Sequence, residues 1–368
     1  MRIPFVDLTT QYKSIKKDID KAIAEVIEET AFIGGKYVQQ FEQQFAEAYG
    51  CKHVVACGNG TDSLYIIMRM LGIKSGDEVI TVANSWISSS ETITQAGAKP
   101  VFIDVHPEYY SMDEAQLKSK ITLKTKAVIA VHLQGQACDI ETIKAICDQH
   151  GLYLIEDCAQ SHFSEYKGRR VGLYGIAASF SFYPGKNLGA YGDAGCIISN
   201  NDAIAEKCRM YARHGALKKH QHEMEGINSR MDGLQAAILS VKLPHILDWT
   251  EKRIANAALY REYLQGIREI CLPVVRPESK HTYHLYVIRA GRRDELANYL
   301  GTHGIETVIH YPRILPNLPA YHYLGHTPTD FPVANRLQSE ILSLPMYPEL
   351  SEEMIQQVAD TIKAFYRK

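Results

Sequence analysis

The sequence predicts an α/β protein whose central sheet is mostly parallel and sandwiched by helices, with a smaller C-terminal α+β domain. Between residues 53 and 199, short apolar runs alternate with amphipathic helical patterns. Strands that are apolar along their whole length are typical of a parallel sheet covered on both faces. A long helical stretch after residue 245 leads out of this alternation. At 368 residues the chain is long enough for two domains, which we expect to span 1–245 and 246–368.

The N-terminal elements follow from hydrophobic periodicity. Apolar residues recur at helical spacing over 12–30 and predict an amphipathic helix, which the glycines of 32–35 end. A second helix is expected over 37–49. The strand 53–57, a glycine-containing loop over 58–63 and a further helix come next. This order points the free backbone amides of the helix start at the end of the sheet, which predicts a phosphate-binding site.

The spacing of Gly58, Gly60 and Ser63 also resembles part of a dinucleotide-binding fingerprint. That fingerprint needs an acidic residue at the end of the second strand to hold the ribose. Here Asp77 and Glu78 precede the second strand, and the third glycine position holds a serine. The pattern therefore argues against nicotinamide binding. A nicotinamide-binding protein would quench nicotinamide fluorescence on mixing and would have no visible colour after purification.

Further strands are predicted from apolar runs at 79–82, 99–104, 127–132, 152–157, 178–182 and 195–199. In such sheets, ligands collect at the carboxyl ends of the strands. Trp86, Asp157 and the loop 58–63 each lie just past a strand end. We therefore expect these three features to line one site.

The C-terminal domain is expected to begin with a long helix over 247–264 and to contain a strand over 284–288. Its last helix has Ser351 as the N-cap. Glu352 and Glu353 fall in the first turn of that helix, where carboxylates interact favourably with the positive helix end. The apolar residues of the helix share one face, which predicts that it packs on the core of this domain.

The charge balance excludes several classes of function. With 40 Lys and Arg against 42 Asp and Glu, the net charge of -2 offers no basic excess for nucleic acid. No apolar run approaches the length of a membrane span, and the first residues lack the apolar core of a signal peptide, so we expect a cytoplasmic protein that binds no membrane. The eight cysteines form no C-x-x-C pair and are expected to be buried free thiols.

Lys186 stands in a loop of glycine, small and aromatic residues within 179–195. Such surroundings partly remove water from the ammonium group, which favours the free amine that Schiff-base chemistry requires. On the loop pattern alone, a surface lysine in a glycine-rich turn is the simpler interpretation. The rest of the chain decides between the two.

Segments 181–189, 156–162 and 58–64 resemble the DegT/DnrJ/EryC1/StrS family of nucleotide-sugar aminotransferases, which depend on pyridoxal phosphate (PLP). The resemblance covers nearly the whole chain and is strongest to the sugar 3-aminotransferases. Further matching segments are 4–8, 76–80, 97–104, 213–215, 228–232, 310–312 and 344–346. The resemblance implies the PLP-dependent transferase fold type I, and a homodimer whose active sites are shared between the subunits.

The resemblance assigns catalysis to Lys186 and Asp157. Lys186 would carry PLP as a Schiff base and then move the proton between the substrate carbon and the cofactor. Asp157 would pair with the pyridinium nitrogen and keep it protonated. Without Lys186, a carboxylate that caps a turn would be the default role of Asp157. The other implied cofactor contacts are Gly60, Thr61, Trp86, Gln160, Ser181 and, from the other subunit, Asn228.

Substrate contacts follow from the same resemblance. Arg230, His310 and Tyr311 match positions that reach the nucleotide sugar across the dimer interface. His162 is a further candidate for a substrate contact, and a structural role for it stays open. The family usually continues this histidine with Gly-Ala, whereas here it is followed by Phe-Ser.

A histidine-rich stretch could suggest a metal site. His214, His220 and His222 lie close together in the sequence, but the adjacent Lys218 and Lys219 favour a mobile basic loop. We therefore expect no metal.

The reaction implied by the resemblance moves an amino group from L-glutamate to a keto carbon of a nucleotide-linked sugar, with pyridoxamine phosphate as the intermediate form of the cofactor. Segment 187–195 resembles members that act on C-3, so a dTDP-3-keto-6-deoxyhexose is the preferred substrate. The product would be a 3-amino-3,6-dideoxy sugar for a surface polysaccharide such as an O-antigen, or for a glycosylated natural product. A 4-aminotransferase acting on a 4-keto sugar is the alternative. A protein that binds PLP or a nucleotide sugar without catalysis is the alternative of another class.

Overall fold

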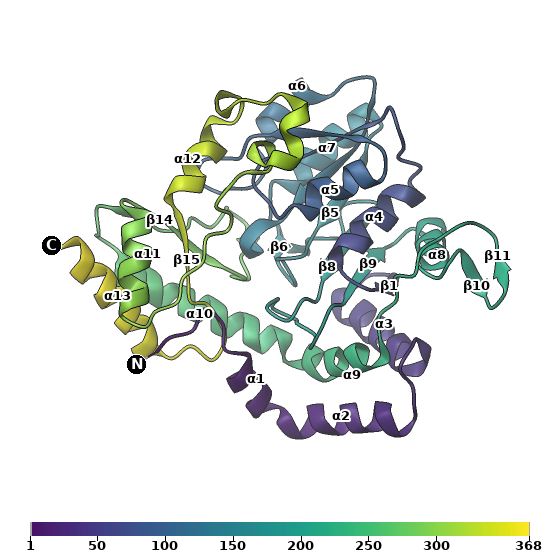
Figure 1. Cartoon of the computed structure of the whole chain (residues 1–368), viewed down its shortest axis with the longest axis horizontal. Coiled ribbons are helices and arrows are strands. Elements are labelled where there is room, and N and C mark those ends of the chain that lie inside the picture. Colours follow the sequence, from purple (N-terminus) through teal and green to yellow (C-terminus); the bar gives the residue numbers. More distant parts are fainter. Residues whose placement is uncertain (1, 368) are drawn as a thin grey trace.

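A seven-stranded sheet forms the centre of the computed structural model, which describes residues 2–367 (Figure 1). In spatial order the strands are β1 (His53–Cys57), β9 (Gly195–Ser199), β8 (Ala177–Ser181), β5 (Tyr153–Asp157), β4 (Thr125–Val131), β2 (Glu78–Val82) and β3 (Lys99–Ile103). Strand β9 runs antiparallel to both of its neighbours, and the other neighbouring pairs are parallel. The predicted α/β class with a mostly parallel sheet is confirmed, and β1 and β9 have the predicted bounds.

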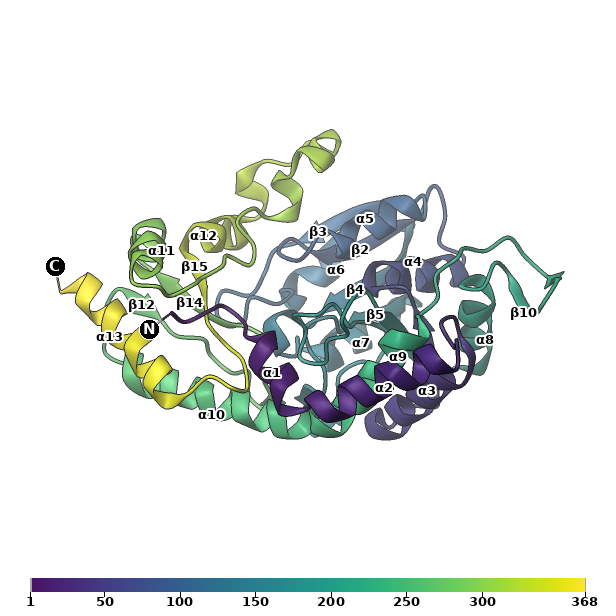
Figure 2. The same cartoon turned by 60° about the horizontal axis from the view of Figure 1, so that its bottom comes forward.

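Helices cover both faces of this sheet (Figure 2). One face carries α4 (Gly60–Met70), α5 (Ser88–Gln95) and α8 (Asp202–Tyr211), and the other carries α3 (Gly35–Tyr49) and α7 (Ile140–His150). Alternation along β8 shows how the two faces differ. The Ser179 hydroxyl bonds to Ser63 of α4, whereas the ring of Phe180 packs against Phe45 and Tyr49 of α3, at centroid distances of 5.5 and 5.0 Å.

The N-terminal segment forms two helices, where the sequence predicts one. α1 (Leu8–Ser14) begins at Asp7, whose carboxylate accepts a hydrogen bond from the amide of Thr10 at 2.9 Å. α2 (Lys16–Glu28) follows after Ile15, which leaves helical geometry at φ -124°. Ile15 is buried, so the break lets an apolar side chain at the junction reach the core. The expectation of one continuous helix over 12–30 is therefore wrong.

The C-terminal part is built around a second, three-stranded sheet. The long helix α10 (Ile246–Leu264) follows α9 (Gly233–Lys242) and leads to this part (Figure 1). Its other elements are β12 (Ile270–Cys271), β14 (Tyr286–Ala290), β15 (Ile341–Leu344), α11 (Arg293–Thr302), α12 (Pro332–Glu340) and α13 (Glu352–Tyr366). As predicted, Ser351 caps α13 by accepting a hydrogen bond from the Met354 amide at 3.3 Å.

Hydrophobic contacts cross the expected boundary between residues 245 and 246. A second core cluster belongs mainly to the C-terminal part, but it also contains Ile3. Conversely, Ile314, Tyr321 and Phe331 pack into the core of the large sheet. Asp104 fixes the same region, since its carboxylate accepts hydrogen bonds from two amides at the start of α12, at 2.8 and 2.9 Å. The two-domain division stays a prediction.

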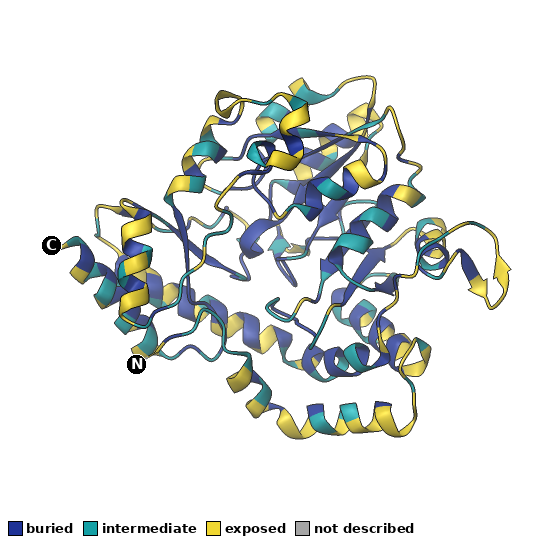
Figure 3. Ribbon diagram, in the orientation of Figure 1, coloured by how far each residue is buried: buried dark blue, intermediate teal, exposed yellow. Residues whose placement is uncertain are grey.

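Short elements complete the chain. They are α6 (Leu117–Lys120), the three-stranded sheet of β13 (Ser279–Lys280), β6 (Glu165–Tyr166) and β7 (Arg169–Arg170), and the hairpin of β10 (Ala216–Lys218) and β11 (Gln221–His222). The hairpin projects from the body of the molecule, and most of it is exposed, whereas the central strands are buried (Figure 3).

The positions of the cysteines can be compared with the prediction that they are buried free thiols. All eight cysteines are free thiols; six are buried, Cys51 is half-buried and Cys271 is exposed, so burial is confirmed for most of them and is wrong for Cys271. Burial raises the pKa of the Cys147 thiol to about 12. Within residues 2–367, no helix is both long and apolar enough to cross a membrane.

Candidate active site

The carboxyl ends of six strands lie at one edge of the large sheet. Cys57 ends β1 and Ser181 ends β8, and both pair with Gly195, the first residue of the reversed strand β9. Val131 at the end of β4 pairs with Asp157 at the end of β5. This is the edge at which open α/β sheets bind ligands. The three features expected there lie at this edge: Trp86 follows β2, Asp157 is the last residue of β5, and the loop 58–63 follows β1.

Lys186 lies in a tightly closed loop after β8. Its amide donates a hydrogen bond to the carbonyl of Tyr183 at 2.8 Å, and the amide of Ala190 donates to the carbonyl of Phe182 at 2.8 Å. Gly189 permits this closure, because a Cβ atom there would lie 2.2 Å from the carbonyl oxygen of Pro184. Lys186 itself is half-buried. Burial lowers the pKa of Lys186 to about 8, and the charge of Asp157 opposes this shift.

The reaction of Lys186 with an aldehyde should therefore depend on pH in a recognisable way. At pH 7 a pKa of about 8 instead of 10.5 increases the free amine roughly 300-fold. We expect the rate at which Lys186 of the cofactor-free protein reacts with PLP to rise with pH and to level off above about pH 8. Stopped-flow absorbance followed by borohydride reduction and peptide mapping measures this rate. A rate that keeps rising towards pH 10.5 would show an ordinary lysine.

Asp157 is held by two donors from its own chain. It is 6% exposed. Its Oδ2 atom accepts a hydrogen bond from the hydroxyl of Ser89 at 2.8 Å, and its Oδ1 atom accepts one from the amide of Ala159 at 3.1 Å. Ser85 and Ser89 share a further hydrogen bond of 2.8 Å. Each carboxylate oxygen keeps capacity for another donor, so the group is oriented and remains able to accept a ring N–H.

Sequence reasoning missed Ser85 and Ser89 as neighbours of Asp157. Ser85 directly precedes Trp86 and Ser89 lies three positions after it, in a run that passes from the end of β2 into α5. The signal was present, because hydroxyl residues at the carboxyl end of a parallel strand face the same edge as Asp157. The bonding partner could not be read from the sequence, since it depends on how α5 is turned about its axis.

Gln160, Tyr311 and Trp86 come together above this edge. The amide of Gln134 donates to Oε1 of Gln160 at 2.7 Å, which leaves Nε2 of Gln160 to donate to the Tyr311 hydroxyl at 2.9 Å. Burial raises the pKa of Tyr311, so this hydroxyl keeps its proton and can donate it to a ligand. The rings of Trp86 and Tyr311 lie 5.7 Å apart, and Trp86 is 59% exposed. An exposed tryptophan face at a sheet edge can stack on a planar ligand.

Gly60, Thr61 and Ser181 form the predicted anion-binding region. Asn59 caps α4 by accepting the amide of Asp62 at 2.8 Å. The amides of Gly60 and Thr61 belong to the first turn and have no acceptor within the helix. A Cβ atom on Gly60 would lie 2.8 Å from Cβ of Ser181, so only glycine allows the helix start to approach β8 this closely. Two free amides beside a serine hydroxyl are well suited to a phosphate.

His162 is fully buried between aromatic rings. Its ring lies 5.4 Å from Phe180 and 5.6 Å from Phe182, and within residues 2–367 neither ring nitrogen makes a hydrogen bond of good geometry. Burial, followed by the charge of Lys186, lowers the pKa of His162 to about 3. Phe163 has a left-handed φ of 60°, a conformation that favours glycine, and packs against Tyr49 at 5.0 Å. These contacts favour packing for His162, and its contact with substrate stays a prediction.

His310 is held in a fixed orientation near Lys186. Its Nδ1 atom lies 2.9 Å from the hydroxyl of Ser343, and its ring stacks on Phe5 at 5.7 Å. Burial, with a contribution from the charge of Lys186, lowers the pKa of His310 to about 4. The imidazole is therefore neutral near pH 7 and acts as a hydrogen-bonding group and not as a charge.

Asn228 and Arg230 have exposed side chains beside the loop that follows β1. Ser229, between them, points inwards: its hydroxyl accepts the amide of Gly58 at 3.0 Å and donates to Oδ2 of Asp62 at 2.7 Å. The segment is thus fixed to the anion-binding region while its neighbours on both sides face outwards. Contacts of Asn228 and Arg230 with a second subunit stay predictions.

Two residues that the sequence analysis did not select, Asn187 and His284, also lie beside Lys186. Nδ2 of Asn187 donates to the carbonyl of Thr282 at 3.1 Å, and Nδ1 of His284 lies 3.2 Å from Oδ1 of Asn187. The charge of Lys186 is one of the causes that lower the pKa of His284. Asn187 directly follows the lysine, which could have drawn attention to it. His284 is 98 positions away from the lysine, and no local pattern connects the two.

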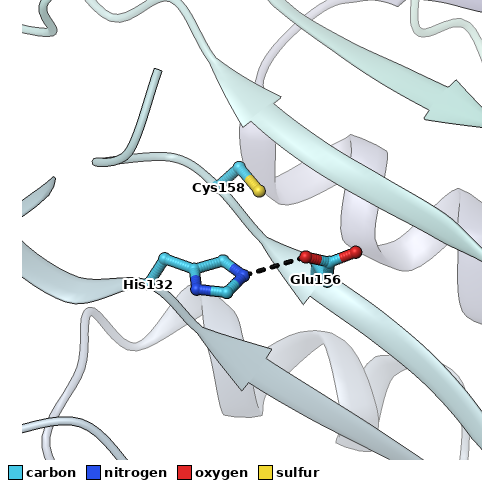
Figure 4. A group of neighbouring side chains, drawn as sticks. All are labelled: His132, Glu156 and Cys158. Atoms are coloured by element: carbon cyan, nitrogen blue, oxygen red, sulfur yellow. Dashed lines mark hydrogen bonds and ion pairs between the residues drawn. The ribbon is translucent and has the colours of Figure 1, made fainter. Parts of the chain in front are cut away.

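His132, Glu156 and Cys158 form a buried group with the geometry of a possible metal site (Figure 4). The protein already uses the ligand atoms of Glu156 and His132. The Glu156 carboxylate accepts hydrogen bonds from the amides of Gly172, Tyr174 and Gly175 at 2.6 to 2.7 Å and lies 3.0 Å from Nε2 of His132. Nδ1 of His132 in turn accepts the amide of Cys138 at 3.2 Å. We therefore interpret the group as a structural network.

His214, His220 and His222, in and beside the hairpin, do not have the arrangement of metal ligands. His220 and His222 are exposed, and Nδ1 of His222 lies 2.7 Å from the backbone carbonyl of His214. Among the described residues, the one group with the spacing of metal ligands is the buried network of His132, Glu156 and Cys158.

Comparison with known proteins gives matches over the whole chain. The sequence model of the DegT/DnrJ/EryC1/StrS aminotransferase family matches residues 13–363. A Geobacillus stearothermophilus protein named "Pleiotropic regulatory protein" is 44% identical, with 100% of this chain and 99% of that protein covered. The dTDP-3-amino-3,6-dideoxy-alpha-D-galactopyranose transaminase of Aneurinibacillus thermoaerophilus is 40% identical, with 99% of each chain covered. The crystal structure of S. venezuelae DesV in complex with a ketimine intermediate has a TM-score of 0.97 and 37% identity, with 100% of this chain and 99% of that chain covered.

Proposed function

Because the chain belongs to the DegT/DnrJ/EryC1/StrS aminotransferase family, we propose that it moves an amino group from L-glutamate to C-3 of a dTDP-3-keto-6-deoxyhexose. The protein is a PLP-dependent sugar aminotransferase of fold type I. The observation that supports the C-3 position best is the 40% identity to a dTDP-3-amino-3,6-dideoxyhexose transaminase over 99% of both chains. The product would be a dTDP-3-amino-3,6-dideoxyhexose for a surface polysaccharide or a glycosylated natural product.

The residues at the sheet edge suit each part of PLP. The first amides of α4 and the hydroxyl of Ser181 suit the phosphate, and the exposed face of Trp86 suits the ring. Asp157 has acceptor capacity for the ring nitrogen, and Lys186 has a pKa near 8, so its free amine is available to the aldehyde. When bound, PLP supplies an aldehyde that joins covalently to amines and a ring that accepts electrons from the substrate carbon.

The chain's own residues then have distinct tasks. Once the substrate amine has taken its place, Lys186 would take a proton from the substrate carbon on its Nζ atom and pass it to the cofactor, and in the second half of the reaction it would move a proton in the opposite direction. The carboxylate of Asp157 holds a proton on the ring nitrogen through an ionic hydrogen bond. Gln160 and Tyr311, joined to each other at 2.9 Å, orient the ligand from the side of the C-terminal part.

The nucleotide sugar carries a diphosphate, which a protein with a net charge of -2 must bind through local cations. We propose that Arg230 and the basic hairpin with Lys218 and Lys219 supply them to the site of a second subunit in a homodimer. All three side chains are exposed in the single chain. Large apolar side chains that are exposed in the single chain support a covered face, since Tyr183 and Ile33 are 59% and 56% exposed.

Replacement of Arg230 with alanine is expected to raise KM for the nucleotide sugar about 10- to 100-fold, because a charged hydrogen bond to a phosphate is lost. The half-reaction with glutamate should not change. Steady-state kinetics with each substrate varied in turn measures both effects, and the exposed Arg268→Ala serves as the matched control. An unchanged KM for the sugar would remove Arg230 from the substrate site.

Subunit mixing tests whether the sites are shared. If Arg230 serves the partner's site, a heterodimer of one Lys186→Ala subunit and one Arg230→Ala subunit contains one site with both defects and one site with neither. Assayed at a nucleotide-sugar concentration well below the raised KM, mixed samples should then show more activity than either parent. If each subunit used its own Arg230, mixing would not increase the activity. Light scattering on the same samples gives the oligomeric state.

A panel of substrates tests the position of amination. The cofactor of the protein is first converted to pyridoxamine phosphate by glutamate. The protein is then mixed with 3-keto and 4-keto nucleotide sugars, and the return of the original cofactor absorbance identifies the acceptor. We expect the dTDP-3-keto sugar to react. Reaction of the 4-keto sugars alone would instead support the 4-aminotransferase alternative.

A non-catalytic function is the second candidate, because the relative at 44% identity carries the name of a regulatory protein. Such a protein predicts no conversion of glutamate into 2-oxoglutarate. The position of Lys186 favours catalysis, since it lies in the loop that leaves the carboxyl end of β8 and is close enough to Asp157 for that charge to act on its pKa. We further propose that the enzyme works in the cytoplasm, in keeping with its free cysteines.

A further inference from the structure

The loop that carries Lys186 is attached to a helix that follows it much later in the chain. Lys242 is the last residue of α9, and its Nζ atom donates a hydrogen bond to the carbonyl of Gly189 at 2.7 Å. The same Nζ atom lies 4.2 Å from the centre of the Tyr191 ring, which is close enough for a cation–π contact. Lys242 is completely buried, so these two contacts take the place of water around its ammonium group.

Packing alone does not account for an ammonium group at this position. Burial lowers the pKa of Lys242 to about 8, and the charge of Glu349 opposes this shift. The group is therefore mostly charged at pH 7, and among residues 2–367 no carboxylate forms an ion pair with it. Burying an unpaired charge costs free energy, which a methionine of about the same length would avoid. The contact with the Gly189 carbonyl explains the charge better than packing does.

The Gly189 carbonyl belongs to the peptide unit that closes the loop. The N–H group of the same unit is that of Ala190, which donates to the carbonyl of Phe182 at 2.8 Å. The unit is thus held at both ends, and a rotation of it would break both hydrogen bonds. A cation at the carbonyl also polarises the peptide unit and strengthens the hydrogen bond that its N–H donates. Lys242 therefore stabilises the hydrogen bond that closes the loop 182–190.

The same helix makes a second contact with this loop. Gln235 lies about two helical turns before Lys242, so both side chains are on the same face of α9. The Oε1 atom of Gln235 accepts a hydrogen bond from the amide of Tyr191 at 2.9 Å. The start of α9 is itself fixed, because the amide of Gly233 donates to the carbonyl of Phe32 at 2.7 Å. α9 is therefore a firm support for the loop.

We propose that Lys242 is a positioning residue for Lys186: by fixing the Gly189–Ala190 peptide unit, its ammonium group sets the path of the loop and so the place of the Lys186 amine at the sheet edge. The inference rests on the proposed function, in which Lys186 joins the cofactor and moves the proton. Lys242 takes part in no proton transfer. It acts on Lys186 through the backbone of the loop.

Lys242→Met tests this role, because it removes the charge and the donor and keeps an unbranched side chain of about the same length. We expect kcat to fall about 10- to 100-fold, since a charged hydrogen bond is lost and the amine of Lys186 is placed less precisely. KM for both substrates should change by less than about threefold. Lys207→Met makes the same exchange at an exposed position of α8 and should keep the original kcat.

A second measurement concerns the loop directly and needs no turnover. Amide hydrogen exchange is followed by mass spectrometry on the full-length protein freed of cofactor, because bound cofactor would itself hold Lys186. In Lys242→Met we expect the peptide that covers 183–192 to exchange about 10-fold faster or more, while peptides from β2 and α13 keep their rates. A role in general stability alone would instead raise exchange in all three peptides.

Faster exchange confined to 183–192, together with a lower kcat, would support the proposal. An unchanged kcat in folded Lys242→Met, or exchange in 183–192 that rises no more than elsewhere, would overturn it. If Lys242→Met does not fold, as judged by circular dichroism, Lys242→Gln replaces it, since its amide is polar but one bond too short to reach the Gly189 carbonyl. Failure of the proposed function shows separately, as the lack of a borohydride-stable cofactor on Lys186 of the original protein.

Discussion

Lys186→Ala is expected to lower the rate of amino transfer by about 10⁴-fold or more, the largest effect of any single substitution, because the variant loses both the nucleophile and the proton carrier. Cofactor should still bind through the α4 start and Asp157, without a covalent link. Borohydride treatment should then leave no cofactor on the protein. Small primary amines added at high concentration should restore part of the rate, since they supply the missing base.

The control for this experiment uses the other lysine with a lowered pKa. Lys242 is fully buried, its pKa is lowered to about 8 by burial, and its Nζ atom donates to the carbonyl of Gly189 at 2.7 Å. Reactivity alone therefore does not separate the two lysines, but only Lys186 belongs to the loop that leaves the carboxyl end of β8. Mapping of the reduced original protein should find the cofactor on Lys186. A tag on Lys242, or retained activity in Lys186→Ala beside the exposed control Lys207→Ala, would contradict the mechanism.

Much of the fold was predictable because its signals are local. β1 and β9 have the predicted bounds, and Ser351 caps the last helix, since these features depend on short apolar runs and on one side chain at a helix start. The break at Ile15 was not predictable, because it depends on where the core lies and not on the helical period. The packing of Tyr321 into the core of the large sheet likewise depends on contacts far apart in the sequence.

The candidate site likewise contains residues that local sequence patterns predict and residues that they do not. Lys186 and Asp157 stand in recognisable segments, and the chain brings them to one edge because both follow parallel strands of the same sheet. No local pattern shows that Ser89 bonds to Asp157 or that His284 lies beside Asn187. The rotation of α5 about its axis brings Ser89 to Asp157. The close approach of a distant segment to Gly135 fixes the position of His284. Roles across a subunit interface depend on a second chain, so those of Asn228 and Arg230 stay predictions.

The network around Glu156 carries the second large expected effect, on stability. Glu156 is completely buried at the end of β5, next to Asp157 in the chain. Its Oε1 atom accepts the amides of Tyr174 and Gly175, and its Oε2 atom accepts the amide of Gly172 and faces Nε2 of His132 (Figure 4). Because Nδ1 of His132 accepts the Cys138 amide, Nε2 must carry the proton and donate to Glu156. Four donors thus converge on one carboxylate.

Glu156→Gln is nearly the same shape and yet should destabilise the protein by about 3–5 kcal/mol, because it breaks a buried charged network. One carboxylate oxygen becomes an NH2 group, which must face either the amides of Tyr174 and Gly175 or the N–H groups of Gly172 and His132, and donors cannot bond to each other. His132 cannot adapt by moving its proton to Nδ1, since that atom would then face the Cys138 amide.

Urea unfolding followed by circular dichroism, at one fixed protein concentration, measures the free energy of unfolding of this variant. Glu206→Gln on the exposed side of α8 makes the same chemical change where the side chain is solvated, and it should alter the free energy by less than about 0.5 kcal/mol. If the two glutamine variants unfolded at the same urea concentration, the carboxylate of Glu156 would not be organising the turn at 172–175. The network would then be a consequence of the fold and not one of its causes.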